Sequence, residues 1–193
     1  PEKLEFTGDA FPVAEQIFYE PLSSQAAFSF SENGVLAYQT GGSRGSKLRW
    51  YDLAGKQIGE IPHQALHYDV RLSHDSRRAA VSFYDARVRS VDIWIFEFAR
   101  NVWTRMTSDP ATDRFPVWSP NDDAIIFSSL RDIHPGLYQQ AVGRASNGQM
   151  LFESKFSLTA SDWSSDGKFV AMNTPDRNST GLWILPIAGD GKA

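Results

Sequence analysis

The stretch Ser161-Asp-Trp-Ser-Ser-Asp-Gly167 decides the fold, because close variants of it occur three more times in the 193-residue chain. Each variant has an apolar or aromatic residue, then a serine, then a polar turn. The serines are 42, 46 and 45 residues apart and are Ser31, Ser73, Ser119 and Ser164. A second anchor recurs at intervals of 45, 44 and 45 residues, as Leu48-Arg-Trp-Tyr51, Ile93-Trp-Ile-Phe96, Leu137-Tyr-Gln-Gln140 and Leu182-Trp-Ile-Leu185. Two anchors with one period establish a repeat of about 45 residues.

Each repeat contains four short segments that we predict to be strands. The segment after the serine turn is apolar, as in 35–38, 79–83, 124–127 and 169–172. Gly34 and Gly167 close their turns where a positive φ is needed. The third strand carries the Trp or Tyr of the second anchor, and a fourth follows, as in Arg100–Met106. Four antiparallel strands in about 45 residues make one β-propeller blade, so we predict an all-β propeller with about four blades.

We predict a single propeller region over residues 1–193. Residues 1–27 are assigned to a linker and to the fourth strand of a preceding blade. We predict the turn and this strand at Thr7–Ala14. The blades then cover residues 28–66, 67–112, 113–157 and, without a fourth strand, 158–193. The spare strand either completes the last blade or completes a blade of a neighbouring chain. Open strand edges and apolar blade faces favour association, so we expect self-association, for example two chains in an eight-blade ring.

The composition excludes several classes of protein. With 19 Lys and Arg against 23 Asp and Glu, the net charge is −4, which disfavours nucleic-acid binding. A hydrophobic content of 41% is too high for a disordered chain. No apolar run approaches the ~20 residues that span a bilayer, so we predict no direct membrane insertion. The absence of Cys excludes disulfides and thiolate metal sites, and we predict no cofactor and no metal.

The tryptophans are predicted to be core residues. Because the middle strands of a blade are covered on both faces, runs such as Ile125-Ile-Phe127 are continuously apolar. Trp118 and Trp163 are assigned to positions between blades, and Trp94 and Trp183 to blade cores.

Two motifs resemble catalytic or metal sites without the required context. Gly41-Gly-Ser43-Arg-Gly45 has the spacing of a hydrolase nucleophile elbow, but that elbow joins a strand to a helix, and here it joins two strands. His63 and His67 are four residues apart, a ligand spacing that suits a helix, whereas they flank the link between two blades. We therefore predict neither a nucleophile at Ser43 nor a metal at the histidines.

Polar residues just before the innermost strands are the main candidate binding site. In a propeller these positions ring the central channel, where a peptide or small ligand can bind. The alternative is that they solvate the channel or form hydrogen bonds between blades. The candidates are Gln25, His67, Tyr68, Asp69, Asp113, Arg114 and Thr159.

The loops between second and third strands are a second candidate surface, because basic residues gather there. An acidic protein partner fits this surface, and solvated loops are the alternative. The basic residues are Arg44, Lys47, Arg87, Arg89 and Arg131.

The third and fourth repeats resemble a known family. Pro116-Val-Trp-Ser-Pro-Asn-Asp122, with Ser129-Leu-Arg131 and Leu137-Tyr138 beyond it, is similar to the TolB-like propeller repeat, roughly Pro-x-Trp-Ser-Pro-Asp-Gly followed by Ser-x-Arg and Leu-Tyr. The resemblance covers residues 11–193. Four positions depart from the pattern: Phe30 and Leu72 replace Trp, and Ser76 and Asp122 replace Gly.

The resemblance implies a non-catalytic module that binds a protein or peptide as a scaffold or sensor. The segments around Phe11–Glu15, Phe28–Tyr38 and Trp183–Pro186 look most like propellers fused to bacterial serine/threonine kinases, which implies an extracytoplasmic or periplasmic location. Similar arrays also gate prolyl-oligopeptidase-type serine peptidases or form periplasmic TolB, which partners an envelope lipoprotein. Both remain alternatives.

Overall fold

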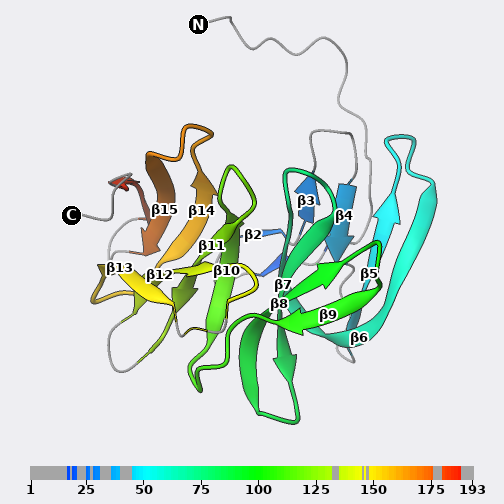
Figure 1. Cartoon of the computed structure of the whole chain (residues 1–193), viewed down its shortest axis with the longest axis horizontal. Helices are drawn as coiled ribbons and strands as arrows, with labels where there is room; N and C mark the ends of the chain where they lie inside the picture. Colours follow the sequence, from blue (N-terminus) through cyan, green and yellow to red (C-terminus); the bar gives the residue numbers. More distant parts are fainter. Residues whose placement is uncertain are drawn as a thin grey trace, which may run out of the picture.

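The structure is a computed structural model that describes residues 17, 19–20, 25–26, 28–30, 36–39, 45–131, 135–144, 146, 148–175 and 180–187. Within these residues there are sixteen strands and no helix, so the predicted all-β fold is confirmed. Figure 1 shows the sheets standing side by side, with β14 and β15 at one end of the array and β4 to β6 at the other. The predicted strand at 7–14, Ser43 and Arg44 lie outside the described residues.

Seven consecutive strands form one continuous antiparallel sheet. They are β3 (Phe28–Phe30), β4 (Leu36–Gln39), β5 (Ser46–Tyr51), β6 (Gln57–Leu72), β7 (Arg78–Asp85), β8 (Ser90–Glu97) and β9 (Val102–Arg105). The long strand β6 belongs to two units, because residues 57–65 pair with β5 and residues 66–72 pair with β7. We call β3 to β6 the first sheet and β6 to β9 the second sheet.

Two further antiparallel sheets follow. The third sheet contains β10 (Asp113–Trp118), β11 (Ala124–Ser129), β12 (Gly136–Ala141) and β13 (Gln149–Glu153). The fourth sheet contains β14 (Thr159–Trp163), β15 (Phe169–Pro175) and β16 (Thr180–Pro186). A separate ladder pairs β1 (Tyr19–Glu20) with β2 (Gln25–Ala26). The first strands of the four sheets lie next to one another in the order β3, β6, β10, β14, as innermost strands of propeller blades do.

The repeated serine forms the turn between the first two strands of a sheet. Ser73 Oγ accepts a hydrogen bond from the backbone N–H of Arg78, five residues later, at 2.9 Å. The same bond, also 2.9 Å long, joins Ser119 to Ala124 and Ser164 to Phe169. Each hydroxyl satisfies the first backbone donor of the second strand, which explains why serine recurs at the period of the repeat.

Three apolar cores fill the spaces between the four sheets. Neighbouring residues of β11 face opposite cores: Ile125 and Phe127 pack toward the second sheet, and Ile126 packs toward the fourth. Trp118 and Trp163 are buried in these cores, as predicted. The prediction for Trp183 is wrong: this residue lies on β16, the last strand of the fourth sheet, and is largely exposed.

Candidate functional site

The predicted channel residues Asp69 and Arg114 join the second sheet to the third. Arg114 Nε donates to the Asp69 carboxylate at 3.2 Å, and the backbone N–H of Phe115 donates to it at 3.3 Å. The Arg114 guanidinium lies 4.5 Å from the ring centroid of Tyr68 and 4.6 Å from that of Phe115. Ser82 Oγ also donates to Asp69. The bonds from Arg114 and Phe115 connect two blades, which was the alternative to a binding role, whereas the bond from Ser82 lies within the second sheet.

A β-bulge in β10 positions this group. The pairing of β10 with β11 shifts between Arg114 and Val117, and Phe115 has a φ of 56°. An aromatic residue rarely adopts this left-handed conformation, which costs roughly 1–3 kcal/mol. The bulge brings the N–H and the ring of Phe115 against Asp69 and Arg114, so the ion pair and the cation–π contacts offset that cost.

Asp113 and Arg131 form a second, fully buried pair inside the third sheet. An Arg131 amino group lies 3.2 Å from the Asp113 carboxylate, and the guanidinium lies 4.6 Å from the ring centroid of Tyr138. Burial raises the pKa of Asp113, against the opposing effects of Ser129 and Arg131. Neither side chain is at the surface. The placement of Asp113 on an open rim and of Arg131 on a binding loop is therefore corrected, because each group neutralises the other in the interior.

His67 is also buried, which corrects its placement on a rim. Its Nδ1 lies 2.9 Å from Ser46 Oγ, and its Nε2 lies 3.2 Å from Nδ1 of His63. Ser46 Oγ donates to the carbonyl of Ala65. Burial, reinforced by His63, lowers the pKa of His67 to about 3, so both imidazoles are neutral near pH 7.

The direction of donation in this chain follows from chemistry. Since the Ser46 hydroxyl donates to Ala65, it accepts from His67 Nδ1–H. His67 Nε2 then accepts from His63 Nδ1–H, and the lone pair of His63 remains on Nε2. Both histidines are neutral, and each donates from Nδ1. His63, His67 and Ser46 therefore form one directed chain of hydrogen bonds, which we call the neutral histidine relay.

The remaining predicted rim residues are not brought into this group. Thr159 begins β14, is partly buried and pairs with Asn173. Gln25 lies in β2 opposite Glu20, and its side chain is outside the described residues. A binding role for the channel residues stays a prediction.

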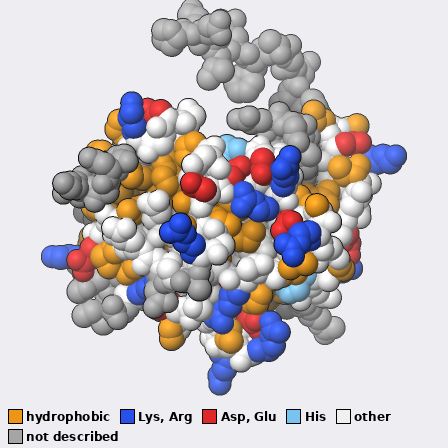
Figure 2. Space-filling view, in the orientation of Figure 1, with side chains coloured by type: hydrophobic (Ala, Val, Ile, Leu, Met, Phe, Trp, Pro, Cys, Tyr) orange, Lys and Arg blue, Asp and Glu red, His pale blue; other side chains and the backbone are white. Residues whose placement is uncertain are grey.

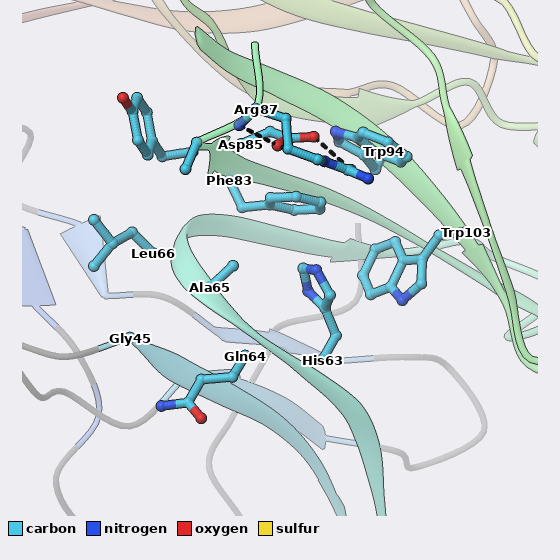
Figure 3. Close-up of a pocket in the computed structure, with 12 residues that line it drawn as sticks. Gly45, His63, Gln64, Ala65, Leu66, Phe83, Asp85, Arg87, Trp94 and Trp103 are labelled. Atoms are coloured by element: carbon cyan, nitrogen blue, oxygen red, sulfur yellow. Dashed lines mark hydrogen bonds and ion pairs between the residues drawn. The ribbon is translucent and has the colours of Figure 1, made fainter. Parts of the chain in front are cut away.

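A cavity of about 850 Å³ opens between the first and second sheets. Figure 3 shows Leu66, Ala65 and His63 on β6 at one side of it, and Phe83, Trp94 and Trp103 at the other. The volume lies within the 300–1,000 Å³ that is usual for ligand sites. The complete lining is Gly45, His63, Gln64, Ala65, Leu66, Phe83, Tyr84, Asp85, Ala86, Arg87, Trp94 and Trp103.

A second bulge shapes this cavity. The pairing of β5 with β6 jumps from Leu48–Ile61 to Lys47–Gln64, which leaves Pro62 and His63 without partners in the ladder. Proline has no N–H to lose and is tolerated at bulges. The bulge turns His63 toward the aromatic side chains of the second sheet: its ring centroid lies 4.7 Å from that of Phe83 and 5.0 Å from that of Trp103.

The walls of the cavity are aromatic, and its mouth is polar. Phe83 stacks on Trp94 at 5.3 Å between centroids and meets Trp103 edge-on at 5.6 Å. At the mouth Asp85 accepts two side-chain hydrogen bonds from Arg87, at 2.7 and 3.0 Å. These bonds lower the pKa of Asp85 to about 2, so the pair stays ionised at ordinary pH. Trp94 Nε1 is enclosed, and no acceptor for it is found among the described residues.

Sequence reasoning found parts of this cavity but not the cavity itself. The sequence predicts Arg87 as a partner-binding residue and His67 as a rim residue, and it offers His63 and His67 as a pair only with the spacing of metal ligands. In the described part of the chain, no three His, Asp or Glu residues come together in a metal-binding group. One pattern in the sequence could have indicated the cavity. Phe83, Trp94 and Trp103 lie in the second, third and fourth strands of one repeat, so one sheet carries an aromatic residue on each of three strands.

The surface around the cavity mouth is mixed apolar and basic. Leu66 and Val88 are about half exposed, and the side chain of Arg87 is largely exposed. Arg89, which the sequence places on the same candidate surface, is exposed in the same turn. Figure 2 shows that basic and acidic side chains lie close together on the face it presents, with apolar side chains between them. In the residues described, no helix is long and apolar enough to cross a membrane.

Comparisons with known proteins identify the fold. No protein-family model and no curated protein matches the sequence. The chain is similar to the crystal structure of TolB from Acinetobacter baumannii, with a TM-score of 0.67 and 20% identity over 83% of this chain and 40% of that chain. It is also similar to putative TolB from Agrobacterium tumefaciens, with a TM-score of 0.67 and 19% identity over 86% of this chain and 59% of that one.

A prolyl endopeptidase structure is similar too, with a TM-score of 0.60 and 14% identity over 83% of this chain and 27% of that chain. This chain therefore spans less than two thirds of the length of each of these structures. Identities of this size establish the fold alone. The chain has the β-propeller fold that is found in TolB and in prolyl endopeptidase.

Proposed function

We propose that this chain is a non-catalytic propeller scaffold that binds a protein partner, and that the cavity between the first and second sheets holds an apolar side chain of that partner. The observation that carries the proposal is the aromatic lining formed by His63, Phe83, Trp94 and Trp103. Aromatic residues and arginine provide most of the binding energy at protein interfaces, and here both occur at one opening.

The polar groups of the cavity favour an uncharged anchor. Asp85 is already paired with Arg87, and burial lowers the pKa of His63, which keeps this imidazole neutral. Asp85 therefore offers no unpaired carboxylate to a charged anchor. Leu66 and Val88 extend the apolar surface beyond the opening, which fits a peptide chain that continues past its anchor.

The arrangement of the polar residues supports a non-catalytic role. A serine nucleophile needs an accessible hydroxyl beside a base. Ser46 does lie beside His67, but its hydroxyl is buried and donates to the Ala65 carbonyl.

Binding can be tested with peptides selected from a random displayed library on the purified chain. We expect the selected peptides to contain an aromatic or aliphatic anchor and to bind with micromolar affinity in calorimetry. Leu66→Glu should weaken binding at least tenfold, because it places a charge at the opening. Leu130→Glu is the matched control, since Leu130 is also about half exposed and does not line the cavity. Equal binding by both variants would refute the cavity as the site.

For the polypeptide that contains this chain, we propose an extracytoplasmic sensing or scaffolding role, as the outer part of a membrane-anchored serine/threonine kinase. The similarity to prolyl endopeptidase favours a second candidate, a propeller that gates a peptidase domain. The similarity to TolB favours a third, an envelope component with a lipoprotein partner. The complete reading frame separates them, since a kinase domain with one transmembrane helix, a serine hydrolase domain, or neither would be found next to these repeats.

A further inference from the structure

The fourth sheet differs from the others at its outer edge. The second and third sheets each end in a fourth strand, β9 and β13, and the first sheet ends in the first half of β6. In the described residues β16 pairs with β15 on one side, and no strand pairs with its other side. The fourth sheet therefore has a backbone edge at the position where the other sheets carry one more strand.

Comparison with equivalent positions of the other repeats shows which side chains are exposed at this edge. Leu182 occupies the position of Ile93 and Leu137, because each pairs with the corresponding residue of the second strand: Asn173, Ser82 and Ser128. Ile93 and Leu137 are 0% exposed, whereas Leu182 is 71% exposed.

The next two residues repeat the contrast. Trp183 is 57% exposed, while the equivalent Tyr138 is buried beside Met150 of the fourth strand β13. Ile184 is 58% exposed, while the equivalent Ile95 is buried. Three consecutive apolar side chains are thus exposed on both faces of one edge strand.

The chemistry of β16 is that of an interior strand. Thr180-Gly-Leu-Trp-Ile-Leu-Pro186 contains no charged residue. The strands at the outer edges of the other sheets carry charges: Glu60 in β6, Arg105 in β9 and Glu153 in β13. Charges on an edge strand discourage pairing with another chain, and an uncharged apolar edge invites it.

We propose that the outer edge of β16 pairs antiparallel with β16 of a second copy across a two-fold axis at Trp183. A two-fold contact requires a segment that complements itself, and β16 does so. With Trp183 opposite Trp183 of the second copy, Leu182 of each copy lies opposite Ile184 of the other. Aromatic and aliphatic pairs then face each other at the centre of the contact, and each copy adds a fourth strand to the sheet of the other. This contact is separate from the cavity and does not depend on the proposed function.

Oligomeric state measured by light scattering across a dilution series tests the pairing. We expect a dimer at high micromolar concentration that dissociates on dilution, and a monomer at all concentrations for Trp183→Lys and Ile184→Lys. Leu53→Lys is the matched control, since Leu53 is 58% exposed in a turn of the first sheet, and this variant should stay dimeric. Circular dichroism of each variant confirms folding. A monomeric wild type, or equal dissociation by Leu53→Lys, overturns the proposal.

A cysteine variant tests the register. The chain has no Cys, so Trp183→Cys introduces a single thiol. Directly opposed residues of antiparallel strands have Cα atoms about 4.5–5.5 Å apart, within the range that a disulfide spans. Mild oxidation should link two copies of Trp183→Cys and leave Leu53→Cys mostly unlinked. A wild type that is dimeric by light scattering, together with a Trp183→Cys variant that does not cross-link, refutes pairing through β16 at Trp183.

Discussion

The guanidinium of Arg114, on the first strand of the third sheet, lies 3.2 Å from the carboxylate of Asp69, on the first strand of the second sheet. Both side chains are largely buried, and the contact spans 45 positions of sequence, which is one repeat. The ion pair thus links equivalent strands of neighbouring sheets.

Arg114→Leu should destabilise the fold by roughly 2–4 kcal/mol, because it leaves the Asp69 carboxylate in a low-dielectric environment without its cation. Urea denaturation measures the change. Arg100→Ala is the control: Arg100 is largely exposed, its ion pair with Glu97 is 3.5 Å long, and its loss should be nearly neutral. If Arg114→Leu abolished peptide binding without loss of stability, the predicted ligand role of the channel residues would replace the structural one.

Arg131→Met should be more destabilising than Arg89→Ala, although the sequence predicts both arginines on the same binding loops. Removing Arg131 leaves Asp113 buried without its cation, at a cost of roughly 3–5 kcal/mol. Since burial already raises the pKa of Asp113, losing the cation raises it further. An acid with a raised pKa in the folded state loses stability as the pH rises from its unfolded pKa through its folded pKa.

The measurement is urea denaturation of both arginine variants at pH 4, 5, 6 and 7. The stability deficit of Arg131→Met should grow with pH over this range. A deficit that stays constant would mean that Asp113 does not become protonated in the variant. Arg89→Ala should follow the wild type throughout.

The buried His67 predicts a loss of stability between about pH 6.5 and pH 5, above the range in which most carboxylates titrate. Its pKa falls to about 3 in the folded chain, whereas the unfolded chain binds a proton near pH 6.5. Between these two pKa values the unfolded state holds one more proton than the folded state. The free energy of unfolding therefore decreases as the pH falls, and the contribution of His67 to it is fully present only above pH 6.5. His67→Gln should be less stable at pH 7 and should show a flatter profile from pH 6.5 to pH 5. A wild-type profile that is flat in this interval would contradict the neutral histidine relay.

Asp122→Gly should destabilise the chain even though the residue has a φ of 57°, where glycine is the favoured residue. The Asp122 carboxylate accepts hydrogen bonds from the backbone N–H groups of His74 and Asp75, at 2.9 and 2.8 Å, and from the His74 ring at 2.8 Å. These bonds join the first turns of the second and third sheets. Their loss should cost roughly 1–3 kcal/mol in thermal or chemical denaturation.

Ser76→Gly is the matched comparison, because Ser76 holds the same position of the preceding repeat and also has a φ of 57°. There the relief of the left-handed conformation should leave stability nearly unchanged. If Asp122→Gly were as well tolerated as Ser76→Gly, the contact between the turns would contribute little. The departure of Asp122 from the glycine of the repeat pattern would then have no structural reason.

The fold was predictable from the sequence because its determinants are local and repeated. At the three described turns the serine bonds a backbone group only five residues away, so the same short pattern has the same effect in each of them. The two anchors of each repeat then lie on the first and third strands of one sheet. Residues whose burial depends on a neighbouring sheet were harder to place. Trp183 follows the pattern of a core position, but its burial needs a further strand beside β16.

The candidate site was less predictable because it depends on irregularities. The cavity exists because Pro62 and His63 bulge out of the β5–β6 ladder. The periodicity of apolar residues in the sequence does not predict where a bulge occurs. The partners of Asp113 and Arg131 are fixed by register across the third sheet, which spacing alone does not give. The sequence predicts that these polar residues lie on a channel rim or a binding loop, and the choice between a binding role and an internal ion pair requires their distances.

The shared strand β6 has a consequence for folding. Its two halves are the outermost strand of one sheet and the innermost strand of the next, with no loop between them, so movement of one half on opening is passed directly to the other half. In hydrogen–deuterium exchange the first two sheets should therefore exchange as one cooperative unit. The third and fourth sheets share no strand and can open one at a time. Protection of the backbone amides should therefore be lost first in the fourth sheet and then in the third sheet, whose first strand is β10, before the two joined sheets exchange.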